Sequence, residues 1–265
     1  MTASLSFTTA LFVPGDRPER FAKAAASGAE AVILDLEDAV APANKEAARA
    51  GLTTGFGDVP ILVRINARGT LWHVADLAAV AELDVAAIVL PKAEMDGALD
   101  PIHAGPARRL PVIALIETAR GLADARAIAA HPAVARLAFG SIDFCADLGC
   151  AHEREALFLA RSELVLASRL RGLPAPIDGV TTAIDNAVLI TEDARHGRML
   201  GFGGKLCIHP KQIEPVRAGY APDEAEIAWA ERILASGEGA AAVDGAMVDE
   251  PVRITARAIL SKQMR

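Results

Sequence analysis

Short apolar runs alternate along this chain with longer segments whose apolar residues recur at a helical period. Eight of the short runs are read as strands, at residues 10–13, 31–36, 61–65, 86–90, 112–116, 135–139, 175–180 and 204–208. They are apolar throughout rather than alternating, as expected of strands with both faces buried. Helices should follow each run, most clearly over 18–27, 71–83, 153–171 and 185–197. Eight consecutive strand–helix units predict an α/β fold, a (β/α)8 TIM barrel over residues 1–222.

The last part of the chain, residues 223–265, does not continue this alternation. A helix is expected over 223–237, a loop of small residues over 239–245, and a last helix after Asp249-Glu250-Pro251. We expect a C-terminal helical extension that packs on the barrel or on a neighbouring subunit.

Composition narrows the class of partner. With 52% hydrophobic residues among 265, the chain can bury a large core. A net charge of −7 provides no basic field for nucleic acid or an anionic membrane, so a small-molecule partner is favoured. The three cysteines include no Cys-x-x-Cys pair and are read as free thiols of a reducing, cytoplasmic setting. No run reaches the roughly 18 apolar residues of a membrane span.

Two carboxylates follow neighbouring strand ends and are the main candidates for chemistry. Glu117 comes directly after the fifth apolar run and Asp143 shortly after the sixth. Parallel strands end at one rim of a barrel, so both acids should lie there. Two protein carboxylates with water in the other positions suit Mg²⁺, with Mn²⁺ as the alternative, and the uncharged loop Gly140-Ser141-Ile142 is assigned to substrate binding. The pattern leaves open that these acids only begin helices.

Three further charged residues sit at strand ends. Arg64 lies on an otherwise apolar strand, and its guanidinium can hold a substrate carboxylate through two hydrogen bonds. A structural salt bridge to an acid of the second strand is the second interpretation, and the two are compatible. Glu37 and Lys92 are expected to form a partly buried ion pair that orients metal-bound water. Asp249, before Pro251, is explained by spacing alone as a helix start.

Eight segments taken in order resemble one family, the citrate lyase β-subunit-like proteins of the CoA-ester lyase branch of the HpcH/HpaI aldolase/citrate lyase family. The resemblance covers nearly the whole chain, and its segments are residues 11–15 with 17–21, 33–40, 63–66, 90–94, 116–121, 139–144, 207–213 and 247–252.

The resemblance implies an enzyme, a Mg²⁺-dependent carbon–carbon lyase. It would cleave a 3-hydroxyacyl thioester, similar to citryl-, malyl- or citramalyl-CoA, to a 2-keto acid such as oxaloacetate and an acyl thioester. By resemblance, Glu117 and Asp143 bind the metal, Arg64 binds the keto acid, and Asp249 of an adjacent subunit acts in catalysis. A homotrimer or hexamer is implied.

Several alternatives stay open beside this reading. The thioester partner is CoA or an acyl-carrier protein, and hydrolysis of the thioester is a variation on the same site. A metal-dependent aldolase of free hydroxy-keto acids and a non-catalytic subunit of a lyase complex are the other candidates. One departure from the family is Ile142, where relatives often carry an acid beside the metal aspartate, and it is expected to affect the choice of substrate.

Overall fold

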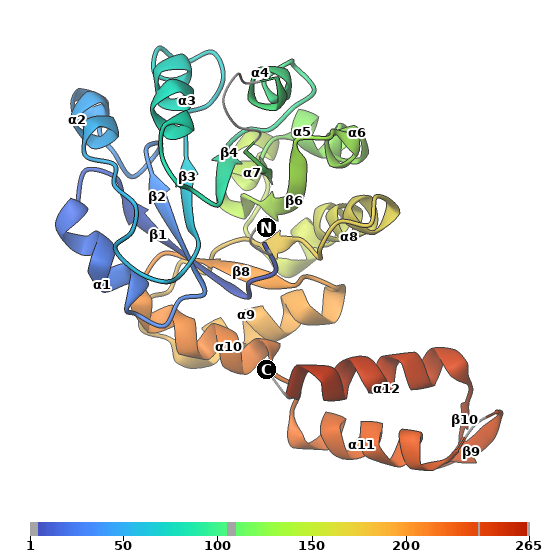
Figure 1. Ribbon diagram of the computed structural model, residues 1–265. Coiled ribbons are helices and arrows are strands. Elements are labelled where there is room, and N and C mark those ends of the chain that lie inside the picture. Colours follow the sequence, from blue (N-terminus) through green and yellow to red (C-terminus); the bar gives the residue numbers. More distant parts are fainter. Residues whose placement is uncertain (1–4, 105–109, 238, 264–265) are drawn as a thin grey trace.

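The structure of the chain is a computed structural model that describes residues 5–104, 110–237 and 239–263. Eight parallel strands close into a barrel in chain order, and the last strand pairs with the first (Figure 1). The strands are β1 (Thr9–Pro14), β2 (Ala31–Asp35), β3 (Ile61–Arg64), β4 (Ala87–Leu90), β5 (Val112–Ile116), β6 (Val134–Phe139), β7 (Ile177–Asp178) and β8 (Gly204–Cys207). The predicted (β/α)8 barrel is confirmed.

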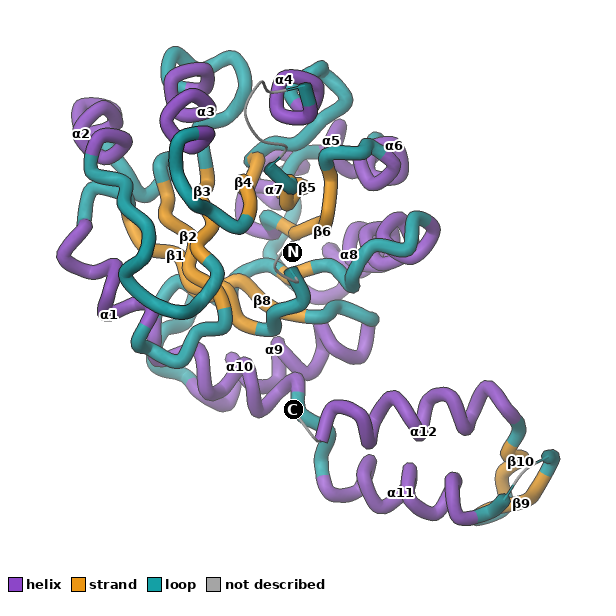
Figure 2. Tube along the Cα trace, viewed as in Figure 1, coloured by secondary structure: helices purple, strands orange, loops and turns teal. Residues whose placement is uncertain are grey.

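Helices surround this barrel on the outside (Figure 2). They are α1 (Phe21–Ala25), α2 (Lys45–Ala50), α3 (His73–Ala81), α4 (Leu99–His103), α5 (Ala119–Ala123), α6 (Ala125–Ala130), α7 (Ser141–Leu148), α8 (Arg154–Leu170), α9 (Ala187–Leu200) and α10 (Ile213–Tyr220). Three short 3-10 turns, η1 (Pro18–Arg20), η2 (Pro42–Asn44) and η3 (Pro210–Gln212), precede α1, α2 and α10. No helix in the described part of the chain is long and apolar enough to cross a membrane.

Two elements differ from the sequence pattern. The seventh strand was expected over 175–180 but consists of Ile177 and Asp178 alone. Pro176 explains its late start, because proline has no N–H to donate to a neighbouring strand. The stretch after β6 was expected as a loop, yet α7 begins at Ser141 with Gly140 alone between strand and helix, and it ends at Gly149 in the left-handed conformation. This places Asp143 in the first turn of a helix.

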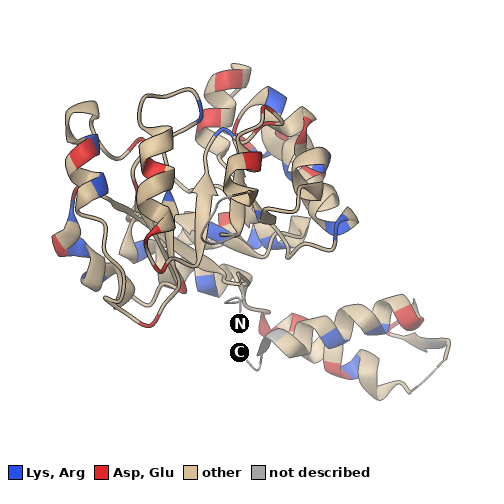
Figure 3. Cartoon of the chain, turned by 45° about the horizontal axis from the view of Figure 1, so that its top comes forward, with Lys and Arg blue, Asp and Glu red and all other residues tan. Residues whose placement is uncertain are grey.

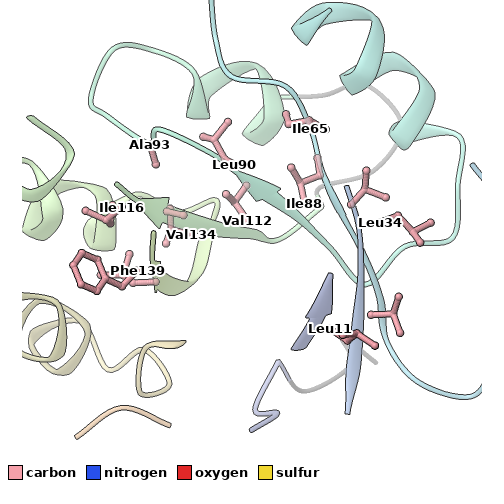
Figure 4. Packing of buried hydrophobic residues seen from close by; sticks show 14 of the residues in the cluster. Leu11, Leu34, Ile65, Ile88, Leu90, Ala93, Val112, Ile116, Val134 and Phe139 are labelled. Atoms are coloured by element: carbon pink, nitrogen blue, oxygen red, sulfur yellow. The ribbon is translucent and has the colours of Figure 1, made fainter. Parts of the chain in front are cut away.

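Side chains alternate between the two faces of each strand, and this divides the hydrophobic core into two layers. Ile113 and Leu115 of β5 belong to the cluster that fills the barrel interior. Val112 and Ile116 of the same strand belong to the larger cluster between strands and helices (Figure 4). Because side chains alternate, the next residue in phase with 113 and 115 is Glu117, whose side chain therefore points into the barrel at its carboxyl-terminal mouth.

The C-terminal extension lies beside the barrel as a unit with its own small core (Figure 1). It consists of α11 (Glu224–Ala235), β9 (Ala241–Val243), β10 (Ala246–Val248) and α12 (Glu250–Gln263). The antiparallel pair β9–β10 corrects the expectation of a plain loop over 239–245, because a turn with Asp244 and Gly245 at positive φ joins two short strands. Both helices of the extension, α11 and α12, carry acidic and basic residues (Figure 3). The division of the chain at residue 222 stays a prediction.

Closure of the barrel between β8 and β1 depends on Gly204. A Cβ added there would lie 2.7 Å from the carbonyl oxygens of both Phe7 and Thr8. We expect Gly204→Ala to lower the free energy of unfolding by about 2 kcal/mol, as overpacking against backbone does, measured by urea denaturation. Gly51→Ala is the control, because φ is −85° there and the nearest atom to an added Cβ is 3.3 Å away. Equal stability of the two variants would contradict this account.

Candidate active site

Glu117 lies at the centre of the barrel mouth and is held by the backbone of the neighbouring strand end. Its Oε1 accepts a 2.8 Å hydrogen bond from the N–H of Lys92. Lys92 has a φ of +47°, one of two positive values among the described residues other than glycine. This left-handed conformation costs about 1–2 kcal/mol for a residue with a side chain. In this conformation the N–H of Lys92 points toward the buried carboxylate of Glu117.

The second oxygen of Glu117 has no partner. Oε2 is buried and makes no hydrogen bond within the described part of the chain. Space for it depends on Gly140, because a Cβ there would lie 2.2 Å from that oxygen and 2.5 Å from the Glu117 Cβ. A buried carboxylate oxygen without a donor is costly unless a cation or donor reaches it. The arrangement fits an added positive charge at this point.

Arg64, at the end of β3, is already engaged by an acid of β2. Its Nε and Nη2 donate to Oδ1 and Oδ2 of Asp35 at 2.7 and 2.6 Å. Burial opposes the guanidinium charge, but Asp35, with Glu37 and Glu117, outweighs it and raises the Arg64 pKa. The face of the group lies over Phe12, with Cζ 4.8 Å from the ring centroid. The structural salt bridge is thus present, and Nη1 lies within ion-pair distance of two further acids, 3.0 Å from Glu37 Oε2 and 3.7 Å from Asp38 Oδ2.

Glu37 and Lys92 form the ion pair that was expected. Lys92 Nζ donates to Glu37 Oε1 at 2.8 Å and lies 3.8 Å from Glu117 Oε1, so it bridges two acids. Glu37 Oε2 lies 3.0 Å from Nη1 of Arg64, in an ion-pair contact whose angle falls short of a hydrogen bond. Burial raises the Glu37 pKa, against the opposing charges of Arg64 and Lys92. Whether the pair orients metal-bound water stays a prediction.

Asp143 reaches the same mouth from the first turn of α7. Its charge raises the pKa of Glu117, which places the two carboxylates within electrostatic reach. Within the described part of the chain Asp143 makes no hydrogen bond or ion pair, so its oxygens are open to a ligand.

The mouth as a whole carries an excess of acid. It brings together five carboxyl groups, of Asp35, Glu37, Asp38, Glu117 and Asp143, and three cations, Arg64, Lys92 and Lys45. No group of three or more His, Cys, Asp or Glu side chains is placed to hold a metal among the residues described. Two open carboxylates fit a hard cation that keeps water in its other positions, and they do not fit zinc.

The loop assigned to substrate binding starts α7, and its residues differ in exposure. Gly140 stands against Glu117, and Ile142 is 38% exposed at the rim. Ser141 is buried, and its hydroxyl lies 2.9 Å from Nε2 of His152. Its side chain is therefore turned away from solvent, and a contact with substrate would use its backbone N–H.

Asp249 is the one predicted site residue that the structure does not bring to the mouth. It lies between β10 and α12, at the end of the extension away from the barrel (Figure 1). Its Oδ1 accepts from the N–H of Val252 at 3.4 Å, as a residue at a helix start does. A catalytic role in this chain's own barrel is not compatible with that position.

Sequence reasoning did not single out every residue of the mouth. Phe12 and Lys45 were missed, and Lys45 Nζ donates to the carbonyls of Leu36 and Glu37 at 2.7 Å each, which fixes the loop that carries Glu37. The sequence offered one indication of Phe12, its position on the first strand in the register that faces the barrel interior. Lys45 gave none, because its acceptors are backbone atoms brought to it by the fold.

Comparison with known proteins agrees with this geometry. The model of the family described as HpcH/HpaI aldolase/citrate lyase matches residues 8–210. The chain belongs to the HpcH/HpaI aldolase/citrate lyase family. Among its relatives, a citrate lyase subunit beta-like protein of Mycobacterium tuberculosis is 43% identical over 95% of this chain and 94% of its own. A (3S)-malyl-CoA thioesterase of Cereibacter sphaeroides is 37% identical over 97% and 94%.

The similarity to solved structures of the family includes the C-terminal extension. The crystal structure of protein CitE from M. tuberculosis, in complex with magnesium, acetoacetate and coenzyme A, gives a TM-score of 0.89 at 40% identity. It covers 98% of this chain and 99% of that one. A citrate lyase beta subunit from the same organism, complexed with oxaloacetate and magnesium, gives 0.73 at 40% identity over 84% and 100%. The predicted lyase family is thus confirmed.

The protonation of Glu117 generates a testable pH dependence. Burial, then the charge of Glu37, raises its pKa from 4.5 to about 8, against Lys92 and Arg64. Between these values the folded chain keeps a proton that the unfolded chain releases, so the free energy of unfolding falls as pH rises. In metal-free buffer we expect a slope up to about 1.4 kcal/mol per pH unit steeper than in Glu117→Gln.

Urea denaturation of both proteins at several pH values between about 5 and 8 measures this difference. Glu214→Gln, whose side chain is 84% exposed, is the control and should follow the wild type. Parallel curves for wild type and Glu117→Gln would show that Glu117 is not held protonated.

Proposed function

We propose that this protein is a Mg²⁺-dependent lyase that cleaves a 3-hydroxyacyl-CoA type of thioester into a 2-keto acid and an acyl thioester. The observation that carries the proposal is the buried Glu117 Oε2, which has no hydrogen-bond partner among the described residues, with the carboxylate of Asp143 within electrostatic reach. Magnesium and coenzyme A in the CitE complex, and oxaloacetate with magnesium in the citrate lyase beta subunit, support it, because they are the ion, the carrier and a 2-keto acid of the proposed reaction. Mn²⁺ is proposed as a substitute ion.

The residues of the mouth would have different roles in binding the metal and the substrate. Glu117 and Asp143 would hold the metal. Bound there, Mg²⁺ would supply Lewis-acid polarisation of the substrate hydroxyl and lower its pKa. Arg64 is fixed by Asp35 through Nε and Nη2, and it would turn Nη1 from Glu37 to the substrate carboxylate. Lys92 holds Glu37 and balances Glu117, while the N–H groups at the start of α7 would face the keto-acid part.

The proton has to be moved by a group outside this cluster. The acids of the mouth are occupied by cations or assigned to the metal, and Asp249 of the same chain is remote from it. We propose that Asp249 of a neighbouring copy supplies the base in a homo-oligomer, a trimer or hexamer. The extension that carries it stands beside the barrel with its own core, a form suited to reaching another subunit.

The 37% identity to a (3S)-malyl-CoA thioesterase favours hydrolysis as a second candidate reaction on the same thioester. The test is an assay of purified protein with Mg²⁺ against citryl-, malyl- and citramalyl-CoA, reading keto acid and free thiol separately. Release of keto acid supports the lyase, and thiol without keto acid supports hydrolysis. Cleavage of free hydroxy-keto acids alone would overturn the CoA proposal in favour of an aldolase, and no turnover would favour a non-catalytic subunit.

The metal assignment predicts a specific loss. Glu117→Gln and Asp143→Asn should each weaken Mg²⁺ binding by at least about 100-fold, the upper end of what loss of an outer partner costs, measured by isothermal titration calorimetry. Asp147→Asn, on the same helix α7 and bonded to the N–H of Ala119, is the matched control and should bind normally. Unchanged affinity in either ligand variant would remove that residue from the site.

The assignment of Asp249 to a neighbouring copy predicts complementation. Asp249→Asn and Glu117→Gln should each be inactive alone while Asp249→Asn still binds Mg²⁺. Co-refolded in equal amounts, the two variants should regain about a quarter of wild-type turnover, since about that share of sites in a mixed symmetric oligomer combines the two intact residues. Full turnover by Asp249→Asn alone would show that the residue is not the base.

A further inference from the structure

We propose that Ser141 and His152 are a pair of positioning residues, which fix the first turn of α7 and so hold the carboxylate of Asp143 where a divalent cation is bound. The proposal rests on the proposed function of Glu117 and Asp143 as the metal site. It adds two residues of this chain to which neither the motifs nor the comparisons give this role.

The Ser141 hydroxyl occupies a space that the fold leaves for it. Ser141 is 1% exposed. A Cβ on Gly179, just past β7, would lie 2.2 Å from Ser141 Oγ and 3.1 Å from the carbonyl oxygen of Phe139. The hydroxyl is therefore enclosed between the ends of β6 and β7, and a substrate carbonyl cannot reach it. This burial is why Ser141 and His152 are not a nucleophile and base, although serine and histidine at hydrogen-bond distance have that role elsewhere.

The segment after α7 folds back along the helix to bring His152 to this hydroxyl. Gly149 turns the chain with a φ of +72°, and the N–H of Cys150 donates to the carbonyl of Cys145 at 3.1 Å. Cys145 Sγ then lies 3.6 Å from the carbonyl oxygen of Ala151. The next residue, His152, places Nε2 2.9 Å from Ser141 Oγ. The first residue of α7 is thus joined to a residue just past its C-terminal end.

The protonation of the imidazole suits this contact. Loss of solvent lowers the pKa of His152, and Arg161 and Lys205 lower it further, against Asp193 and Asp178. A neutral ring has one nitrogen able to accept the hydroxyl proton of Ser141.

Little else restrains the end of α7 that carries Asp143. Gly140 has no side chain to cap the helix, and the first backbone bond, from the N–H of Phe144 to the carbonyl of Gly140, is 2.9 Å long. Phe144 packs on Phe139, with ring centroids 5.4 Å apart, which holds the inner face of the helix. Asp143 itself has no hydrogen bond or ion pair in the part of the chain that is described. The bond from Ser141 to His152 is the side-chain hydrogen bond of this turn.

The experiment measures metal affinity apart from turnover. Ser141→Ala and His152→Leu remove the hydrogen bond, and His152→Gln keeps a polar group near the Nε2 position. Mn²⁺ binding followed by electron paramagnetic resonance, with Mg²⁺ competition, should show about tenfold weaker binding in the first two, as loss of outer partners of a metal site causes. His152→Gln should bind within about threefold of wild type, a rescue that a merely structural packing role would not produce.

His131→Leu is the matched control. This histidine also makes side-chain hydrogen bonds, with Nε2 3.2 Å from Asp100 Oδ1 and Nδ1 accepting from the N–H of Ala133 at 3.2 Å. It lies after α6 on the outside of the barrel, so metal affinity should not change. If Ser141→Ala fails to fold, the two His152 variants decide the question. Wild-type affinity in His152→Leu, or equal weakening in His152→Gln, would overturn the pair. Absence of a stoichiometric Mn²⁺ site in the wild type would overturn the proposed function as well.

Discussion

A carboxylate enclosed at the mouth of the barrel is the constraint on which the site depends. Glu117 lies inside because it continues the interior register of Ile113 and Leu115, and closure of eight strands then surrounds it with other strand ends. One oxygen accepts a hydrogen bond from the N–H of Lys92, whose backbone is strained, and Gly140 leaves space for the other oxygen. An enclosed acid with one oxygen unsatisfied is unfavourable in the free protein and favourable with a cation beside it.

The neighbouring charges are arranged around that acid rather than acting independently. Asp35 accepts hydrogen bonds from Nε and Nη2 of Arg64, and Glu37 lies 3.0 Å from Nη1, so the guanidinium is held by acids from both sides. Lys92 bridges Glu37 and Glu117, which limits the repulsion between them. Among the described residues, Asp143 has no cation as an ion-pair partner. The mouth is therefore one electrostatic unit, in which the charges of Glu37 and Asp143 raise the pKa of Glu117.

Prediction from the sequence succeeded where the signal was local and periodic. The eight apolar runs gave the barrel, and the acids that end the second, fifth and sixth runs were placed at its mouth. The prediction failed where a proline or glycine sets the end of an element, as at β7 and at the start of α7. It also predicted a loop where the β9–β10 hairpin lies. Arg64 illustrates a middle case, since both readings of it were open and the salt bridge to Asp35 is present.

The sequence by itself determined the number and order of strand–helix units, the position of Glu117 at a strand end and the resemblance to the family. These follow from repeat spacing and residue order, which depend on neighbours along the chain. Tertiary structure alone decided that Arg64 is engaged by Asp35, that Ser141 faces His152, and that Asp249 stands apart from its own barrel. Each of these facts depends on residues that are not neighbours along the chain. The path of the folded backbone brings such residues together or keeps them apart.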